Sequence, residues 1–232
     1  MTAKQLTYLF SIPYFILAFL VISVKLLEMP GLENITKPLL LIVLMVWYIV
    51  DNRLNGKMLN LLFVFALFFS LMGDVFLMPL IDNFILGLVF FLLSHLFYIA
   101  VFLKGNYHLI WKSLKQSALY GLLVIAIYIS LLLFLMPAVI ELNSLVLLIA
   151  VPVYATVLML MVLATIVYSK IHNHQFGQFV MIGGLLFLAS DGILAINKFA
   201  EAIDNSAIWV MGSYVLAQWM LVYGYMNSKR FI

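Results

Sequence analysis

Two aspartates stand in segments of the sequence that are otherwise apolar. Asp74 lies in the segment GDVFL and Asp191 in the segment SDGIL. A charged side chain at the centre of a membrane helix costs about 2.5 to 3.5 kcal/mol, so such acids usually face the protein interior and mark a site or a pathway. Two carboxyls away from bulk water can divide acid-base chemistry, because one keeps its proton while the other stays anionic. The alternative is structural: Asp74 would bond to Ser70 and Asp191 to Lys198.

A large apolar face is predicted on the helix that carries His95. Five residues recur there at helical spacing and therefore share one side: Gly87, Phe91, His95, Tyr98 and Phe102. This face suits the wall of an acyl-chain pocket, with His95 as a hydrogen-bonding or proton-transfer group. The alternative is a neutral core histidine bonded to a neighbouring helix, and the sequence does not separate the two.

Two lysines are expected near the outer membrane boundary, at the level of the aspartates. Lys37 lies in the segment TKP that opens the second predicted span, and Lys198 ends the seventh. They either reach the interface as boundary lysines do or form a cationic rim that receives a phosphate. A lysine beside a carboxylate favours the ionised form, so the acid-pair interpretation requires both to stand apart from the aspartates. Further residues assigned to the binding site are Tyr154, Ser190 and Asn197, with Tyr214 and Gln218 as additional candidates for the same cavity.

No metal or other cofactor is expected. A metal site needs three or more converging nitrogen or oxygen ligands, and the spans offer only the two aspartates and His95. The chain has no cysteine, which excludes disulfides, thiolate chemistry and cysteine-ligated centres. The net charge of +3 comes from loop lysines rather than from a basic patch with interleaved aromatics, so no nucleic-acid partner is expected.

The composition predicts an all-α protein that crosses a membrane several times. Hydrophobic residues make up 67% of the 232 residues and charged residues 9%, whereas soluble domains carry roughly 25% charged residues. A membrane-spanning helix needs about 20 apolar residues. Eight such runs are present, at about 7–27, 35–50, 58–79, 83–103, 114–136, 143–168, 178–198 and 206–226. We therefore expect a single helical domain over residues 1–232, with eight transmembrane helices and short connections.

The loop charges predict the orientation of the chain. Of its 12 lysines and arginines, only Lys25, Lys37 and Lys198 fall on one side of the predicted spans. The others lie in the termini and in the loops after the second, fourth and sixth spans. Because positive charge is retained on the cytoplasmic side, both termini are expected in the cytoplasm.

The sequence also suggests an internal duplication. Asp74 and Asp191 are about half the chain apart, and Pro38 and Pro152 have a similar separation. Four helices per half would give two parallel repeats, 1–113 and 114–232, related by an axis along the membrane normal. The two aspartates would then face each other at equal depth, in the outer third of the bilayer core. Chance similarity between apolar helices is the alternative.

Several of these segments together resemble the YhhN-like lysoplasmalogenase family. They are TKP at 36–38, GDVFL at 73–77, the run GLVFFLLSHLFYIAVF with His95 and Tyr98, and SDGILA followed by NKF. The resemblance covers nearly the whole chain. It implies hydrolysis of the vinyl ether bond of a lysoplasmalogen, a lysophospholipid, to a fatty aldehyde and glycerophosphoethanolamine or glycerophosphocholine. The expected location is the cytoplasmic membrane of a bacterium, with the lipid bilayer as surroundings.

This chemistry fits the two aspartates. A vinyl ether is hydrolysed by protonation at carbon, which gives an oxocarbenium ion that water captures. The reaction needs an acid, a negative charge near the cation and a base for the water, and glycosidases meet the same need with a carboxyl pair. Asp74 and Asp191 are therefore the predicted catalytic residues, without an assignment of which is the acid.

Three other functions compete with this prediction. A small-molecule or proton-coupled transporter would use Asp74 and Asp191 as its binding site, and would carry ionisable groups toward both membrane faces. The cytoplasmic half of the predicted spans is nearly free of such groups. An intramembrane aspartyl protease needs a Tyr-Asp and a Gly-x-Gly-Asp context, of which only Gly73-Asp74 is present. A scaffold protein would use the aspartates for folding alone.

Overall fold

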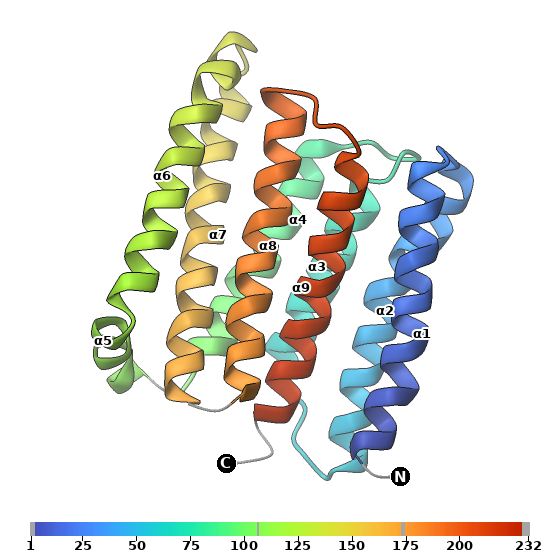
Figure 1. Cartoon of the computed structure of the whole chain (residues 1–232), viewed down its shortest axis with the longest axis vertical. Coiled ribbons are helices and arrows are strands. Elements are labelled where there is room, and N and C mark those ends of the chain that lie inside the picture. The colour runs from blue at the N-terminus through green and yellow to red at the C-terminus, as the bar shows by residue number, and fades with distance from the viewer. Residues whose placement is uncertain (1–2, 106, 173–174, 229–232) are drawn as a thin grey trace. The chain divides into compact units, whose positions relative to one another are not determined.

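Helices make up the computed structural model, which describes residues 3–105, 107–172 and 175–228 (Figure 1). They are α1 (Ala3–Leu26), α2 (Pro30–Leu54), α3 (Leu61–Phe76), α4 (Phe84–Leu103), α5 (Tyr107–Gln116), α6 (Ala118–Glu141), α7 (Leu145–Ile171), α8 (Gln175–Phe199) and α9 (Ser206–Ser228). The described ranges contain no strand. The all-α prediction is therefore confirmed for them.

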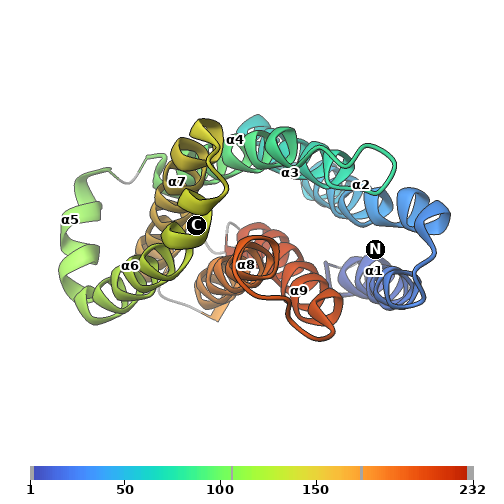
Figure 2. The ribbon, with the colours of Figure 1, turned by 90° about the horizontal axis from the view of Figure 1, so that it is seen from above.

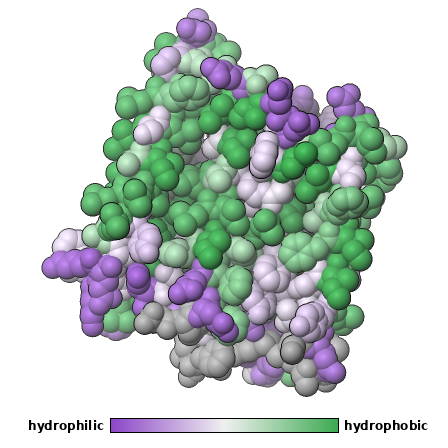
Figure 3. Space-filling view, in the orientation of Figure 1, coloured by the Kyte–Doolittle hydropathy of each residue, from purple (hydrophilic) through white to green (hydrophobic). Residues whose placement is uncertain are grey.

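Seven of the described helices are long and apolar enough to cross a membrane: α1, α2, α4, α6, α7, α8 and α9. On the face shown in Figure 3, apolar side chains cover the long helices and strongly hydrophilic ones gather near their ends. These features make the chain an integral membrane protein. The predicted count of eight spans is not confirmed, because α3 has only 16 residues. The orientation of the termini stays a prediction, and Lys229 and Arg230, which support it, lie outside the described residues.

The chain forms two compact units, unit 1 (Met1–Phe97) and unit 2 (Tyr98–Ile232). The boundary falls within α4, whose first part belongs to unit 1 and whose last turn and a half belongs to unit 2. Each unit has a core of its own. The predicted repeat, with its boundary after residue 113, stays a prediction.

Unit 1 packs α2 between α1 and α3. The buried face of α2 carries Leu40, Leu44 and Trp47, and the Trp47 ring stacks on Phe10 of α1. The helix begins at Pro30, a residue favoured at the first helical position because its φ is preset and its missing N–H would have no partner there. The prediction that the TKP segment opens this span was wrong, since Lys37 lies about two turns inside the helix.

Helix α3 is shorter than the run from which it was predicted. Asn60 caps its start, because the side chain accepts a hydrogen bond from the backbone N–H of Leu62 at 3.1 Å. Its end at Phe76 precedes Pro79, which cannot continue a helix. Near this end Gly73 lets α4 approach closely: a Cβ there would lie 2.6 Å from the Phe91 ring.

Unit 2 is built around α8, which packs on both α7 and α9. The contact with α9 depends on Gly224, where a Cβ would lie 2.8 Å from the carbonyl oxygen of Phe176. Small residues of this kind let membrane helices approach closely. The ten-residue α5 was not predicted as a separate helix. It lies beside the end of α7 and turns into α6 at Ser117 (Figures 1 and 2).

Candidate active site

Asp74 lies in the last turn of α3 and forms a buried ion pair with Lys37 of α2. The Nζ atom of Lys37 is 3.3 Å from Oδ1 of Asp74, and the two side chains are 6% and 3% exposed. The prediction that Lys37 stands apart from the carboxylates was therefore wrong. Its physical basis was incomplete, because a carboxylate that must remain anionic inside a membrane protein is stabilised by a buried cation.

Neighbouring residues of unit 1 surround this ion pair. Ser70, one turn before Asp74, shares a hydrogen bond of 2.7 Å with Ser94 of α4, and the Ser94 hydroxyl lies 2.8 Å from the carbonyl oxygen of Ala66. A second ion pair joins Lys25 to Glu33 at 2.9 Å, near the start of α2. The end of unit 1 that carries Asp74 is thus held by polar contacts between three pairs of helices: α1 with α2, α2 with α3, and α3 with α4.

Asp191 lies in α8 about two turns before the helix ends, and its side chain is partly exposed. Tyr154 of α7 donates a hydrogen bond from its hydroxyl to Oδ2 of Asp191. The tyrosine itself is buried, so α7 presents a phenol to a carboxyl group within unit 2. Tyr154 was predicted to line the binding cavity, and the structure places it in contact with Asp191.

The remaining predicted residues of α8 differ in their surroundings. The Ser190 hydroxyl donates to the carbonyl oxygen of Val210 at 3.0 Å, which ties α8 to α9. The Asn197 side chain accepts from the backbone N–H of Ile203 at 2.9 Å and so shapes the connection that follows the helix. Lys198 is exposed at the end of α8.

The face of α4 that carries His95 is buried, as its helical spacing predicted. In unit 2 its side chains pack against neighbouring side chains. Within unit 2 the Tyr98 hydroxyl donates to Oε1 of Gln218 at 2.9 Å, the Gln218 side-chain amide donates to the Tyr214 hydroxyl at 3.4 Å, and Tyr98 stacks on Phe102. His95 is completely buried. The substrate-binding roles predicted for Tyr98 and His95 stay predictions.

Comparison with known protein families shows to which family the chain belongs. The model of the YhhN family matches residues 32–225. The chain belongs to the YhhN family. The matched range contains both contact pairs described above, Lys37 with Asp74 and Tyr154 with Asp191. No match was found among curated proteins or among solved structures.

This YhhN protein has a further buried acid that the sequence interpretation missed. Asp51, near the end of α2 opposite to Lys37, is 1% exposed. Beside it the Asn52 side chain donates to the carbonyl oxygen of Tyr48 at 2.7 Å, and the Tyr48 hydroxyl accepts from the backbone N–H of Asn60 at 3.2 Å. The spacing of Tyr48, Asn52 and Asn55 along one helix could have indicated this polar cluster. Asp51 is an exception to the expectation that this half of the spans is nearly free of ionisable groups.

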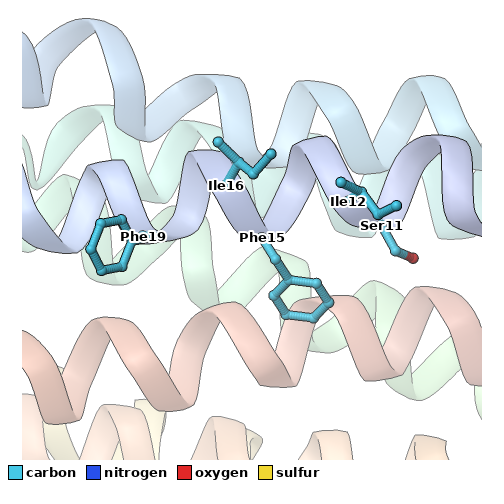
Figure 4. A pocket seen from close by; sticks show the side chains of 5 residues that line it. All are labelled: Ser11, Ile12, Phe15, Ile16 and Phe19. Carbon is cyan, nitrogen blue, oxygen red and sulfur yellow. The ribbon is translucent and has the colours of Figure 1, made fainter.

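An apolar pocket of about 450 Å³ lies on α1 of the same YhhN protein (Figure 4). Its lining residues all come from this helix: Ser11, Ile12, Phe15, Ile16 and Phe19. Four of the five side chains are hydrocarbon, which suits an acyl chain. Among the described residues, no group of three or more histidine, cysteine, aspartate or glutamate side chains could hold a metal ion.

Proposed function

We propose that this YhhN-family protein is a lysoplasmalogenase, which hydrolyses the vinyl ether bond of a lysophospholipid in the cytoplasmic membrane of a bacterium. The observation that carries the proposal is the contrast between its two intramembrane carboxyls. Asp74 has a buried cation beside it, whereas Asp191 has a phenol. Vinyl ether hydrolysis needs one anionic and one protonated group. The Lys37 ammonium stabilises an anionic carboxyl more strongly than the Tyr154 hydroxyl does, which supports Asp74 as the anion and leaves Asp191 as the group proposed to carry the proton.

The partners support a division of roles that the sequence left open. Lys37 stabilises Asp74 as an anion, which makes Asp74 the base and the negative charge beside the oxocarbenium ion. Asp191 is the proton donor. When it is protonated, its carbonyl oxygen still accepts the hydrogen bond of Tyr154, so the other oxygen is oriented with its proton toward the substrate.

The proposed reaction returns both groups to their starting states. Asp191 gives its proton to the vinyl carbon that does not bear oxygen, and the carbon bonded to oxygen becomes the cation. A water molecule adds to that carbon and gives a proton to Asp74. The resulting hemiacetal passes its hydroxyl proton to Asp191 while Asp74 protonates the departing glycerol oxygen. The products are a fatty aldehyde and glycerophosphoethanolamine or glycerophosphocholine.

The pairing of Lys37 changes the predicted binding site. Since Lys37 is engaged by Asp74, the cation proposed for the headgroup phosphate is Lys198, which is exposed at the end of α8. Asn197, beside it, is proposed to position this part of the site through its bond to the following connection. The apolar pocket on α1 is proposed to hold part of the acyl chain.

A proton-coupled carrier is the second candidate, because one observation favours it. Asp51 is buried near the end of α2 opposite to Lys37, so unit 1 has ionisable groups toward both ends of that helix. A carrier would use such groups along a pathway. It would transport its substrate without releasing aldehyde.

The test is aldehyde release by the purified full chain in detergent. A lysoplasmalogen and the corresponding alkyl-ether lysolipid are assayed with the wild type, Asp74→Asn and Asp191→Asn. Asp82→Asn is the matched control, because Asp82 is exposed in a turn with a φ of 43°, which asparagine adopts readily. Aldehyde from the vinyl ether alone, lost in the first two variants and kept in the third, supports the proposal. Activity that survives either of the first two substitutions rejects the acid pair, and an inactive wild type favours the carrier.

A further inference from the structure

We propose that the exposed face of α5 binds the headgroups of anionic phospholipids at the membrane surface. This face consists of His108, Trp111, Lys112 and Lys115, which are all exposed and lie three or four residues apart, and it is called the α5 basic face below. The opposite side of α5 carries Ser113, which is buried, and the half-buried Leu109, Ile110 and Leu114. An amphipathic helix with lysines on its polar side is typical of segments that lie in the plane of a membrane interface, where tryptophan is also enriched.

The direction of α5 agrees with such a position. In Figure 2, α8 and α9 are viewed nearly along their axes, while α5 is viewed from its side. The helix turns into α6 at Ser117, whose hydroxyl donates to the carbonyl oxygen of Ser113 at 2.5 Å. This bond stabilises the bend between an in-plane helix and a spanning helix. In Figure 3 hydrophilic side chains gather where Figure 1 places α5.

Aromatic rings hold two lysines at this level. The Lys115 Nζ atom lies 5.3 Å from the centre of the Trp111 ring, and the Lys170 Nζ atom, at the end of α7, lies 5.5 Å from the centre of the Tyr120 ring. Trp111 is 69% exposed. Tryptophan and tyrosine are enriched at the level of lipid headgroups, and a lysine near them can reach a phosphate.

The acidic residues of unit 2 and the lysines near α5 lie at opposite ends of the unit, while Lys198 lies at the acidic end. Lys104, Lys112, Lys115 and Lys170 lie at the end that contains α5. The four acidic residues of unit 2 are Glu141, Asp191, Glu201 and Asp204, and all lie at or toward the other end. Among the described residues of unit 2, no acidic side chain lies at the end that carries the α5 lysines, where it could compete with a lipid phosphate for them. The orientation predicted from the loop charges places this end in the cytoplasm, where the leaflet surface is negative.

Native mass spectrometry of the full chain in neutral detergent tests this proposal. The protein is titrated with phosphatidylglycerol and, separately, with phosphatidylcholine of the same acyl chains. We expect the wild type to retain phosphatidylglycerol preferentially. Each of Lys112→Gln and Lys115→Gln should weaken its binding about fivefold, and the double variant about 25-fold, as expected for basic residues near an anionic surface. The double variant with arginine at both positions should bind as the wild type does.

The matched control removes two positive charges elsewhere, in the variant Arg53→Gln/Lys57→Gln at the connection between α2 and α3. It should retain the wild-type preference for phosphatidylglycerol. If the two double glutamine variants lose phosphatidylglycerol binding equally, the effect is a general one of loop charge and the proposal is overturned. So would a wild type without preference for the anionic lipid. The single variants give the same comparison if the double variant does not elute as the folded species.

Discussion

Lys37 and Asp74 form an ion pair inside unit 1, with Nζ of the lysine 3.3 Å from Oδ1 of the aspartate and both side chains buried. The pair joins the second turn of α2 to the last turn of α3. Two buried charges are stabilised together only while both are present, because removal of one leaves the other without compensation. The pair therefore ties the stability of unit 1 to the charge state of a proposed catalytic residue.

Removal of the lysine alone should destabilise the protein strongly. We expect Lys37→Met to lower the free energy of unfolding by about 3 to 5 kcal/mol, the usual cost of breaking a buried ion pair from one side. Denaturant unfolding in detergent measures the change. Lys198→Met is the control, since an exposed lysine should change stability by less than about 0.5 kcal/mol. The double variant Lys37→Met/Asp74→Leu should recover most of the lost stability. If Lys37→Met lowers the free energy of unfolding no more than Lys198→Met does, the ion pair is contradicted.

The hydroxyl of Tyr154 should affect the reaction more than binding. Tyr154→Phe keeps the ring in α7 and removes the bond to Asp191. We expect kcat to fall about 10- to 100-fold with little change in KM, since hydrogen bonds to charged groups contribute about 1.5 to 3 kcal/mol. Tyr128→Phe is the matched control, because the Tyr128 hydroxyl bonds to Thr156 of the same helix α7. Equal losses in both variants would indicate a structural effect on α7 instead.

Close contact between α3 and α4 should make Gly73 intolerant of a side chain. In Gly73→Ala the new Cβ would lie 2.6 Å from the Phe91 ring. We expect a loss of about 1 to 3 kcal/mol in unfolding free energy, the usual cost of overpacking. Gly31→Ala tests the same change in α2, where no atom lies within 4 Å of the added Cβ, and should leave stability unchanged or raise it. Unchanged stability in Gly73→Ala would show that α4 moves freely at this contact.

The proposed acid pair also predicts that positions 74 and 191 lie close together in the membrane. The chain has no cysteine, so introduced thiols report on one pair only. We expect the variant Asp74→Cys/Asp191→Cys to be cross-linked by a short bifunctional thiol reagent in native membranes. Asp51→Cys/Asp191→Cys should not be, because Asp51 lies at the other end of α2 from Lys37, the partner of Asp74. Cross-linking of the control alone would reject a shared site.

The helical architecture could be predicted from the sequence because hydropathy reports directly on lipid contact. Each of the eight predicted runs corresponds to a helix of the structure. The ends of the helices were less predictable, because polar residues also continue a helix when they find partners. Glu33 and Lys37 extend α2 well before its apolar run, one paired with Lys25 and the other with Asp74. Helix α5 was not predicted because it has only ten residues, and only one side of it is apolar.

The candidate site was predictable in its carboxylates but not in their partners. An aspartate within an apolar run is conspicuous in any sequence, so Asp74 and Asp191 could be singled out. The contacts of Lys37 and Tyr154 depend on which sides of α2 and α7 face the neighbouring helix, and apolar sequences contain little periodicity from which to derive this. Asp51 lay at the end of a run, where an acid is ordinarily solvated.

Because α3 is short, the stability of unit 1 should depend on the thickness of the bilayer. Its 16 residues rise about 24 Å, whereas the hydrocarbon core is about 30 Å thick. The bilayer thins locally beside a short helix, at a cost of a fraction of a kcal/mol for each ångström of mismatch. The last turn of α3 carries Asp74, so a thinned leaflet brings headgroups nearer to the Lys37–Asp74 pair. Membranes of shorter acyl chains should therefore stabilise unit 1, and thicker membranes should strain it.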